Sequence, residues 1–251
     1  MKRVIAFDLD DTLSESKSQA DDRMVELLGR LLEKFHVCVI SGGKLEQFKK
    51  QLPFIVNGAG HQLENMHLMP TCGTRYYVYD LPKNDWDQVY AEDFKPEDKK
   101  KIIQAMDEAL DETGFRPDKS YGDLIEDRGS QVTVSAVGQE APVDVKKQWD
   151  PEDIKKYQLR DAIAKRIPEF EVRAGGMTSI DVTKQGIDKA YGMKKLMEIL
   201  DIGKSDILFF GDKMHEGGND YPVKNLGIDS VAVRDWEDTA LALEVVLALA
   251  D

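Results

Sequence analysis

Short apolar runs alternate with helical repeats in the first part of the chain. Val4–Phe7 is apolar and partly β-branched and ends directly in acidic residues, as a buried parallel strand does when it carries carboxylates at its C-terminal end. Apolar residues then recur at helical spacing at Met24, Leu27, Leu28, Leu31 and Leu32. Strands are also expected at His36–Ile40 and at residues 54–56, the latter ending in Asn57-Gly58. This alternation predicts a parallel sheet with right-handed crossovers.

The pattern changes after residue 81. Charged helices are predicted over residues 97–113, where Gly114 closes the helix, and over residues 152–167. Strands with one buried side are expected at residues 131–137, 170–173 and 178–182. Such a segment, unlike the sequence on either side of it, is typical of an inserted α+β domain.

From residue 188 the α/β alternation resumes with a helix to residue 200, strands at residues 207–210 and 230–233, and a C-terminal helix rich in Ala and Leu. The predicted fold class is therefore α/β. A Rossmann-like parallel-sheet core covers residues 1–81 and 185–251, and an inserted α+β domain covers residues 82–184.

Charge and cysteine content narrow the possible partners. Lys and Arg number 34 against 47 Asp and Glu, and the net charge of −13 argues against binding to nucleic acid or to an anionic membrane, which need a basic surface. Anionic small molecules stay possible where positive charge is focused locally. Cys38 and Cys72 form no Cys-x-x-Cys motif, so we expect thiols in a reducing compartment. No signal-like segment or long apolar run is present, which predicts a cytoplasmic protein.

Polar residues follow several of the predicted parallel strands. The ends of such strands meet at one edge of an open α/β sheet, where ligands bind. The residues placed there are Asp8, Asp10, Thr12, Ser41, Gly42, Gly43, Asp212, Asn219 and Asp220. Asp8 and Asp212 offer the hard oxygen ligands that Mg²⁺ prefers, and the ion would screen Asp8 from an incoming phosphate. Asp8 could then attack phosphorus to form an aspartyl-phosphate, while Asp10 protonates the leaving oxygen and later deprotonates the resolving hydroxyl.

This arrangement resembles the haloacid dehalogenase (HAD) superfamily, whose four motifs occur in order. They are Phe7-Asp8-Leu9-Asp10-Asp11-Thr12-Leu13, then Ser41, then Lys189, then Gly211-Asp212 with Asn219-Asp220. The resemblance implies that Asp8 is the nucleophile and Asp10 the general acid/base. It implies phosphate contacts at Thr12, Ser41, Gly42 and Lys189, and a Mg²⁺ site at Asp8, Asp10, Asp212 and Asp220, with Asp10 contributing its backbone carbonyl. Asp220 alternatively orients Lys189. The insertion would be a C2-type cap of the type IIB branch.

Within this superfamily the chain most resembles the phosphomannomutase-like family. The resemblance is carried by residues 211–220, in which Asp212 and Asp220 are eight residues apart, by residues 175–181, and by Asp188-Lys189. Commoner C2-capped phosphatases separate the two acids by fewer residues, so this offset is the more specific signal.

The same resemblance implies substrate contacts in the cap. The implied residues are Arg128, Gln139, Lys146, Ser179 and Asp181. Where that branch carries arginines that clamp a sugar bisphosphate, Lys17, Gln139 and Lys146 stand in this chain. Lysine lacks the planar fork that grips phosphate with two hydrogen bonds, and glutamine has no charge. A second phosphate should therefore be held less tightly.

These departures lead us to expect a Mg²⁺-dependent phosphatase that hydrolyses a small phosphorylated metabolite, a sugar phosphate, through an aspartyl-phosphate. The first alternative is a phosphomannomutase that interconverts mannose 1-phosphate and mannose 6-phosphate. The second is a non-catalytic anion-binding module, because fold alone does not guarantee activity. The expected partner is a small phosphate ester, with no nucleic acid and no membrane, and the family resemblance implies a homodimer formed through the cap.

Overall fold

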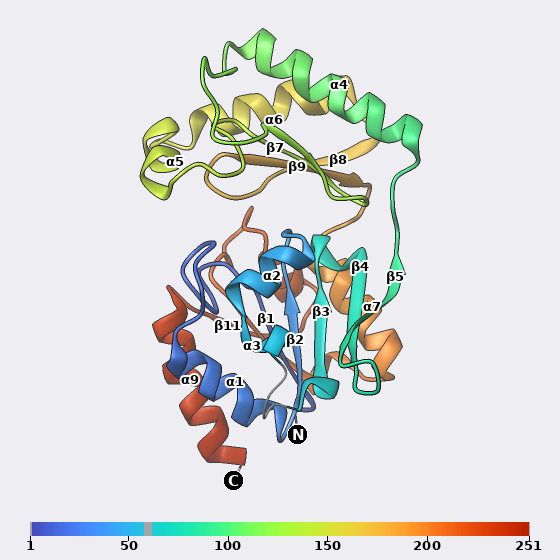
Figure 1. The fold of residues 1–251 in the computed structure, drawn as a ribbon, viewed down its shortest axis with the longest axis vertical. Coiled ribbons are helices and arrows are strands. Elements are labelled where there is room, and N and C mark those ends of the chain that lie inside the picture. The colour runs from blue at the N-terminus through green and yellow to red at the C-terminus, as the bar shows by residue number, and fades with distance from the viewer. Residues whose placement is uncertain (1, 58–61, 251) are drawn as a thin grey trace. The chain divides into compact units, whose positions relative to one another are not determined.

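The computed structural model describes residues 2–57 and 62–250, which form two compact units (Figure 1). The first unit, here called the core, contains the described part of residues 1–91 and 188–251. The second, here called the cap, is Glu92–Ile187. The predicted α/β class with an inserted α+β unit is confirmed, because one sheet is mostly parallel and the other is antiparallel.

The core is built on a seven-stranded sheet in the order β11-β10-β1-β2-β3-β4-β5. Its strands are β1 Val4–Phe7, β2 His36–Ile40, β3 Met66–Met69, β4 Arg75–Asp80, β5 Asp85–Ala91, β10 Ile207–Gly211 and β11 Asp229–Ala232. The strands from β11 to β3 run parallel, whereas β4 and β5 are antiparallel to their neighbours. Five parallel strands therefore deliver their carboxyl ends to one edge of the sheet.

Helices cover both faces of the core sheet. They are α1 Asp22–Leu32, α2 Leu45–Gln51, α3 Phe54–Asn57, α7 Lys189–Leu200, α8 Tyr221–Asn225 and α9 Trp236–Ala250. In β1, Ile5 and Phe7 pack in the cluster that holds α1 and α9, while Val4 and Ala6 pack in the cluster that holds α7 and α8. A strand buried on both faces reads as a continuous apolar run, which is why it could be recognised in the sequence.

The predicted third strand at residues 54–56 is wrong. This segment is α3, in which the Ile55 and Val56 N–H groups bond the carbonyls of Leu52 and Pro53. The strand beside β2 is instead β3. A three-residue apolar run cannot distinguish a strand from a buried helical turn by its periodicity. Gly58, the expected end of that strand, lies outside the described residues.

The cap consists of a four-stranded antiparallel sheet in the order β6-β7-β9-β8 with helices packed on it. Its elements are α4 Pro96–Thr113, β6 Ile125–Asp127, β7 Val132–Ser135, α5 Val143–Trp149, α6 Ile154–Arg166, β8 Phe170–Ala174 and β9 Ser179–Lys184. Gly114 ends α4 in the left-handed conformation expected of a C-terminal glycine, with φ of 70°.

The units divide after Ala91 and Ile187, whereas the sequence placed the divisions after residues 81 and 184. The first difference arises because Pro82 lies in the hairpin turn between β4 and β5. Tyr79 and Trp86 pack edge to face across this hairpin at 5.3 Å, and both belong to the core cluster. The structure adds that no helix among the described residues is long and apolar enough to cross a membrane.

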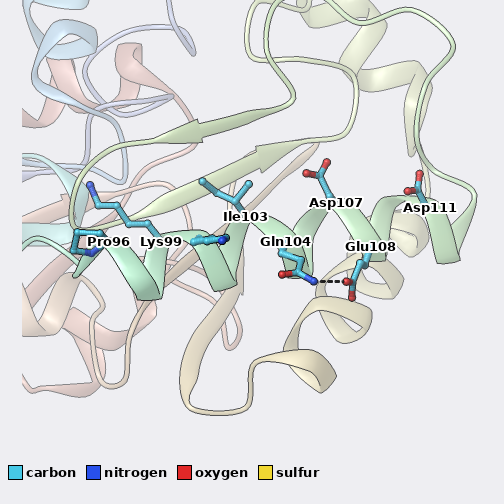
Figure 2. A pocket seen from close by; sticks show the side chains of 8 residues that line it. Pro96, Lys99, Ile103, Gln104, Asp107, Glu108 and Asp111 are labelled. Atoms are coloured by element: carbon cyan, nitrogen blue, oxygen red, sulfur yellow. Dashed lines mark hydrogen bonds between the residues drawn. The ribbon is translucent and has the colours of Figure 1, made fainter.

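A pocket lies along α4 of the cap (Figure 2). It is lined by Pro96, Lys99, Lys100, Ile103, Gln104, Asp107, Glu108 and Asp111. Every lining residue comes from this one helix, and none is among the residues that the sequence assigns to chemistry.

Candidate active site

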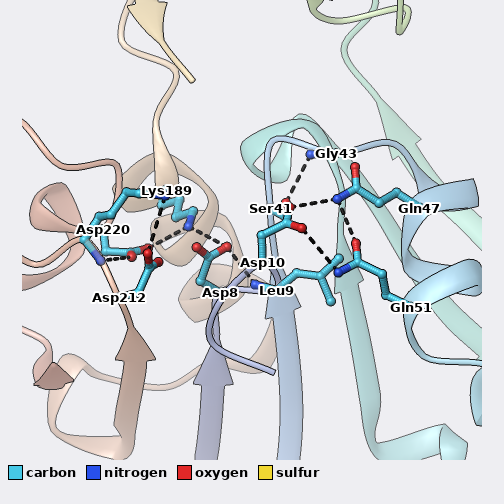
Figure 3. Close-up of polar contacts among 11 residues, drawn as sticks. Asp8, Leu9, Asp10, Ser41, Gly43, Gln47, Gln51, Lys189, Asp212 and Asp220 are labelled. Atoms are coloured by element: carbon cyan, nitrogen blue, oxygen red, sulfur yellow. Dashed lines mark hydrogen bonds and ion pairs between the residues drawn. The ribbon is translucent and has the colours of Figure 1, made fainter. Parts of the chain in front are cut away.

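Asp8 stands immediately after β1, at the carboxyl edge of the core sheet (Figure 3). Its N–H bonds the carbonyl of Phe210, so the residue continues the pairing of β1 with β10. The side chain is buried, and its Oδ1 accepts hydrogen bonds from Lys189 Nζ and from the N–H of Leu9, both at 2.7 Å. One oxygen of this carboxylate, Oδ1, is thus anchored by two donors.

Lys189 is the first residue of α7, whose N-terminus is capped by Asp188 accepting the Tyr191 N–H at 2.9 Å. A lysine gains nothing from the positive end of a helix dipole, so other contacts must hold it there. Its ammonium is 1% exposed and lies 2.7 Å from Asp8 Oδ1 and 2.6 Å from Asp220 Oδ1. Burial alone would lower the pKa of Lys189, but the two carboxylates outweigh it and raise that pKa. Lys189 is therefore held as a cation between two acids.

A close backbone contact positions α7. A Cβ placed on Gly73 would lie 2.5 Å from the Cα of Gly192, and one placed on Gly192 would lie 2.9 Å from the Cys72 carbonyl oxygen. Gly73 lies in a turn, Thr71–Gly73, whose three residues all have positive φ. Only glycine permits this approach without displacement of the helix that begins at Lys189.

Asp220 and Asp212 come from the loop after β10. Asp220 is fully buried, with Oδ1 on Lys189 and Oδ2 accepting the Lys213 N–H at 2.9 Å. In this structure Asp220 therefore orients Lys189, one of the two roles left open by the sequence. A Cβ on Gly211 would fall 2.5 Å from Asp220 Cγ, so the glycine makes room for the carboxylate. Asp212 Oδ1 is buried and has no hydrogen-bond partner among the described residues.

Three carboxylates share this site with the ammonium of Lys189, and the ammonium of Lys213 lies 3.4 Å from Asp212 Oδ2. Burial, opposed by Lys189 and reinforced by Asp220 and Asp212, raises the pKa of Asp8 to about 8. Oxygens of Asp8, Asp212 and Asp220 lie within 4.8 Å of one another. This all-oxygen donor set and the unpartnered Asp212 Oδ1 fit a hard divalent cation such as Mg²⁺.

Asp10 lies two residues beyond Asp8, and its carboxylate accepts hydrogen bonds from side-chain amides (Figure 3). Its Oδ2 accepts from Gln47 Nε2 at 2.7 Å, and its Oδ1 accepts from the Lys17 N–H at 2.9 Å and from Gln51 Nε2 at 3.2 Å. Neither glutamine was singled out from the sequence. The signal in the sequence was that the two glutamines are four residues apart in a segment that follows Ser41. This spacing places both on one face of a helix.

The expected phosphate contacts lie in two turns. Thr12 is buried, and its Oγ1 has no hydrogen-bond partner in the part of the chain that the structure describes. Ser41 follows β2 and its Oγ accepts the Gly43 N–H at 3.1 Å, with Gly42 between them. The carbonyl of Ser41 also accepts the Cys72 N–H, which joins this loop to the turn after β3.

Of the cap residues expected to touch substrate, Ser179 and Asp181 lie on β9, whereas Arg128 and Gln139 lie in loops and Lys146 lies on α5. Arg128 donates from Nε to Glu126 at 2.7 Å, and Asp181 accepts from Thr133 Oγ1 at 2.7 Å. Burial raises the pKa of Asp181 although Arg128 opposes the change. Gln139 donates to the carbonyls of Leu124 and Thr133 at 3.3 and 3.4 Å. Ser179 is the first residue of β9, and Lys146 is buried.

Comparison with known proteins identifies the relatives of this chain. A model of the eukaryotic phosphomannomutase family matches residues 24–249. Phosphomannomutase 2 of Dictyostelium discoideum is 27% identical over 230 residues, which cover 88% of this chain and 86% of that protein. A phosphomannomutase of Saccharomyces cerevisiae is 26% identical over 227 residues, with coverages of 88% and 84%. The family match includes Ser41, Lys189, Asp212 and Asp220, whereas Asp8 and Asp10 precede it.

Solved structures share the fold at lower identity. Plasmodium falciparum IMP-nucleotidase aligns with a TM-score of 0.73 at 16% identity, over 99% of this chain and 71% of that one. The protein SMU.1108c from Streptococcus mutans aligns with a TM-score of 0.65 at 18% identity, over 99% and 100%. These similarities concern the fold alone.

Proposed function

The chain belongs to the eukaryotic phosphomannomutase family of HAD phosphoryl-transfer enzymes, and on that premise we propose that it is a hexose-phosphate mutase. Mannose 1-phosphate and mannose 6-phosphate are the substrates to test first. The observation that carries the proposal is the match of the phosphomannomutase family model to residues 24–249. The contact of buried Asp8 with Lys189 supports phosphoryl transfer at this site. The family comparison thereby reverses the order expected from the sequence, in which hydrolysis came first.

We propose Mg²⁺ as the cofactor, held by Asp8 and Asp212 with Asp220 behind them and with the backbone carbonyl of Asp10 as a further ligand. Their clustered oxygens and the unpartnered Asp212 Oδ1 support this choice. When bound, the ion supplies positive charge that favours the ionised carboxylates and screens an incoming phosphoryl group from them. Lys189 supplies a second positive charge beside the reacting oxygen.

In the proposed reaction Asp8 Oδ2 forms a bond to phosphorus as the bond from phosphorus to the sugar oxygen breaks. The electron pair goes to that oxygen, and Asp10 gives it a proton. In the second step the free hydroxyl of a hexose monophosphate gives its proton to Asp10 and attacks phosphorus, which frees Asp8 and forms a hexose bisphosphate. This bisphosphate turns over in the site and then gives its other phosphoryl group to Asp8 in the same way. Thr12, Ser41 and Gly42 would hold the phosphoryl oxygens, since Thr12 Oγ1 is buried and free to donate.

We propose that the cap group around Arg128 and Asp181 binds the part of the substrate that does not react. Arg128 carries the planar fork suited to a phosphate, and Asp181 can accept hydrogen bonds from sugar hydroxyls. Gln139 and Lys146, together with Ser179, complete the proposed contacts.

A sugar-phosphate phosphatase is the second candidate. It is favoured by Lys17, Gln139 and Lys146, which stand at positions where arginines are expected from the family resemblance. A weakly held bisphosphate would dissociate before it could reverse its orientation in the site. Water would then hydrolyse the aspartyl-phosphate. The non-catalytic alternative is opposed by the presence of Asp8, Asp10 and Lys189 in one site.

The test is to measure isomerisation and phosphate release in parallel. Purified protein with Mg²⁺ and a trace of hexose 1,6-bisphosphate is given mannose 1-phosphate, and mannose 6-phosphate and free phosphate are both quantified. Isomerisation faster than phosphate release is the expected result. The reverse ratio would replace the mutase by the phosphatase, and rates unchanged in Asp8→Asn would overturn the nucleophile. The homodimer and the cytoplasmic location stay predictions, checked by light scattering and by cell fractionation.

A further inference from the structure

Two glutamines on α2 hold the Asp10 carboxylate (Figure 3). Gln47 and Gln51 are one turn apart, and each directs its amide nitrogen at a different oxygen of Asp10. A carboxylate rotates easily about its terminal torsion, because this sp³–sp² rotor has broad, shallow minima. Donors on both oxygens remove that freedom and fix the plane of the carboxylate.

The two glutamines differ in what else they touch. Gln51 is fully buried and also donates to Ser14 Oγ at 2.9 Å, so it belongs to the packing beneath the turn. Gln47 is half-buried and donates to Asp10 Oδ2 at 2.7 Å and to Gln51 Oε1 at 2.8 Å. Both acceptors can only receive hydrogen bonds, which fixes the amide of Gln47 with its nitrogen toward Asp10.

Gln47 is also in contact with the loop after β2. A Cβ on Gly43 would lie 2.4 Å from Gln47 Oε1, so the glutamine amide occupies the space that a side chain at this position would fill. Gln47 is thus wedged between the loop that carries Ser41 and the carboxylate of Asp10. Its position depends on the loop, and the orientation of Asp10 depends on Gln47.

We propose that Gln47 is a positioning residue that aims the Asp10 carboxyl at the leaving oxygen of the substrate. The inference rests on the proposed role of Asp10 as general acid. Proton donation matters most when the leaving group is a poorly stabilised alkoxide such as that of a sugar. A nitrophenolate leaves without that help, because its charge is delocalised. Loss of Gln47 therefore slows transfer from a sugar phosphate and spares transfer from an aryl phosphate.

The experiment compares two leaving groups in Gln47→Met, which keeps the length of the side chain and removes its N–H donors. The value of kcat/KM is measured with mannose 1-phosphate and with 4-nitrophenyl phosphate. We expect a fall of about tenfold for the sugar phosphate and of less than about twofold for the aryl phosphate, a fraction of the factor that general acid catalysis supplies. Asp10→Asn should give the same selectivity with a larger fall for the sugar phosphate.

Lys50→Met, on the exposed side of α2, is the matched control and should change neither value. Gln47→Asn, whose amide is one methylene too short to reach Asp10, should reproduce the selective loss if Gln47→Met folds poorly. An equal fall on both substrates, or no fall on the sugar phosphate, overturns the positioning role while leaving the proposed function in place. A wild-type protein that transfers phosphate from neither substrate overturns both.

Discussion

The core site and the cap group both gather charged residues, but they are held in different ways. In the core, Lys189, Asp8 and Asp220 come from three separate segments, and their side chains are at most 4% exposed. In the cap, Arg128 follows the end of β6 and pairs with Glu126, two residues before it, with exposures of 10% and 21%. The positions of the core side chains depend on one another and on the sheet that carries them, whereas the cap pair joins residues close in sequence. A substitution in the core group should therefore disturb several segments, whereas a substitution in the cap pair should disturb only its neighbours.

Replacement of the nucleophile is the largest expected effect and tests the core side of this comparison. Asp8→Asn should reduce phosphoryl transfer by at least about 1,000-fold, as the loss of a nucleophile does in other enzymes. Without added Mg²⁺ the melting temperature should be unchanged or higher, because the amide places no charge where burial and Asp220 raise the pKa of Asp8. A large fall in melting temperature would show that Asp8 serves the fold as well as the reaction.

Removal of the central cation should damage stability as well as activity. Lys189→Met leaves two buried carboxylates without their partner, which costs about 3–5 kcal/mol when one member of a buried pair is lost. Urea unfolding followed by circular dichroism measures this cost. The double variant Lys189→Met with Asp220→Asn should recover part of it. Failure of the second substitution to recover any stability would argue against mutual dependence in the core.

Protonation of His67 should weaken the part of the core around β3. His67 is buried, bonded to Tyr76 and His36, and burial lowers its pKa to about 4. The unfolded chain therefore protonates His67 first as pH falls, so the contribution of neutral His67 to stability is full above about pH 6.5 and declines by about 3 kcal/mol towards pH 4. The cap contains no histidine. Hydrogen exchange at pH 7 and 4.5 should show greater loss of protection in β3 than in the cap strands, and His67→Gln should reduce that loss.

The smallest effect is expected in the cap. Arg128→Met should change the free energy of unfolding by no more than about 1 kcal/mol, because its ion pair with Glu126 is partly exposed. If Arg128 binds the unreactive end of the substrate, the KM for mannose 1-phosphate should rise in this variant. The kcat with 4-nitrophenyl phosphate should stay close to that of the wild type. A loss of stability comparable to that of Lys189→Met would remove the distinction between the two regions.

The sequence predicted the elements that a clear periodicity or a motif identifies. The residues of α1 face the core as their spacing requires, and β1 and β2 end where their apolar runs end. The segment of α3 was misread because three apolar residues carry no period, and the β4–β5 hairpin was missed because Pro82 marks a turn and a linker equally well. Each error concerns a choice that only packing against the rest of the sheet decides.

In the candidate site, too, some residues could be predicted from motifs and others only from tertiary contacts. The motifs named Asp8, Asp10 and Lys189, whose positions follow from the ends of strands and the start of a helix. They could not name Gln47, because its amide meets Asp10 only through the tertiary placement of α2. They named two roles for Asp220 without choosing between them, and its contact with Lys189 emerged only from the distance between the two side chains. Contacts between segments far apart in sequence are the part that the motifs leave out.

The contact between Gly73 and Gly192 limits how this chain can change over generations. Neither glycine carries a functional group, yet a methyl group at either one would push α7 away and carry Lys189 out of reach of Asp8. In a library of random variants these two positions should be as intolerant as the lysine itself, although Gly192 follows Lys189 by three residues and Gly73 lies in a different segment of the chain. The position of Lys189 thus depends on the absence of a side chain at two other residues.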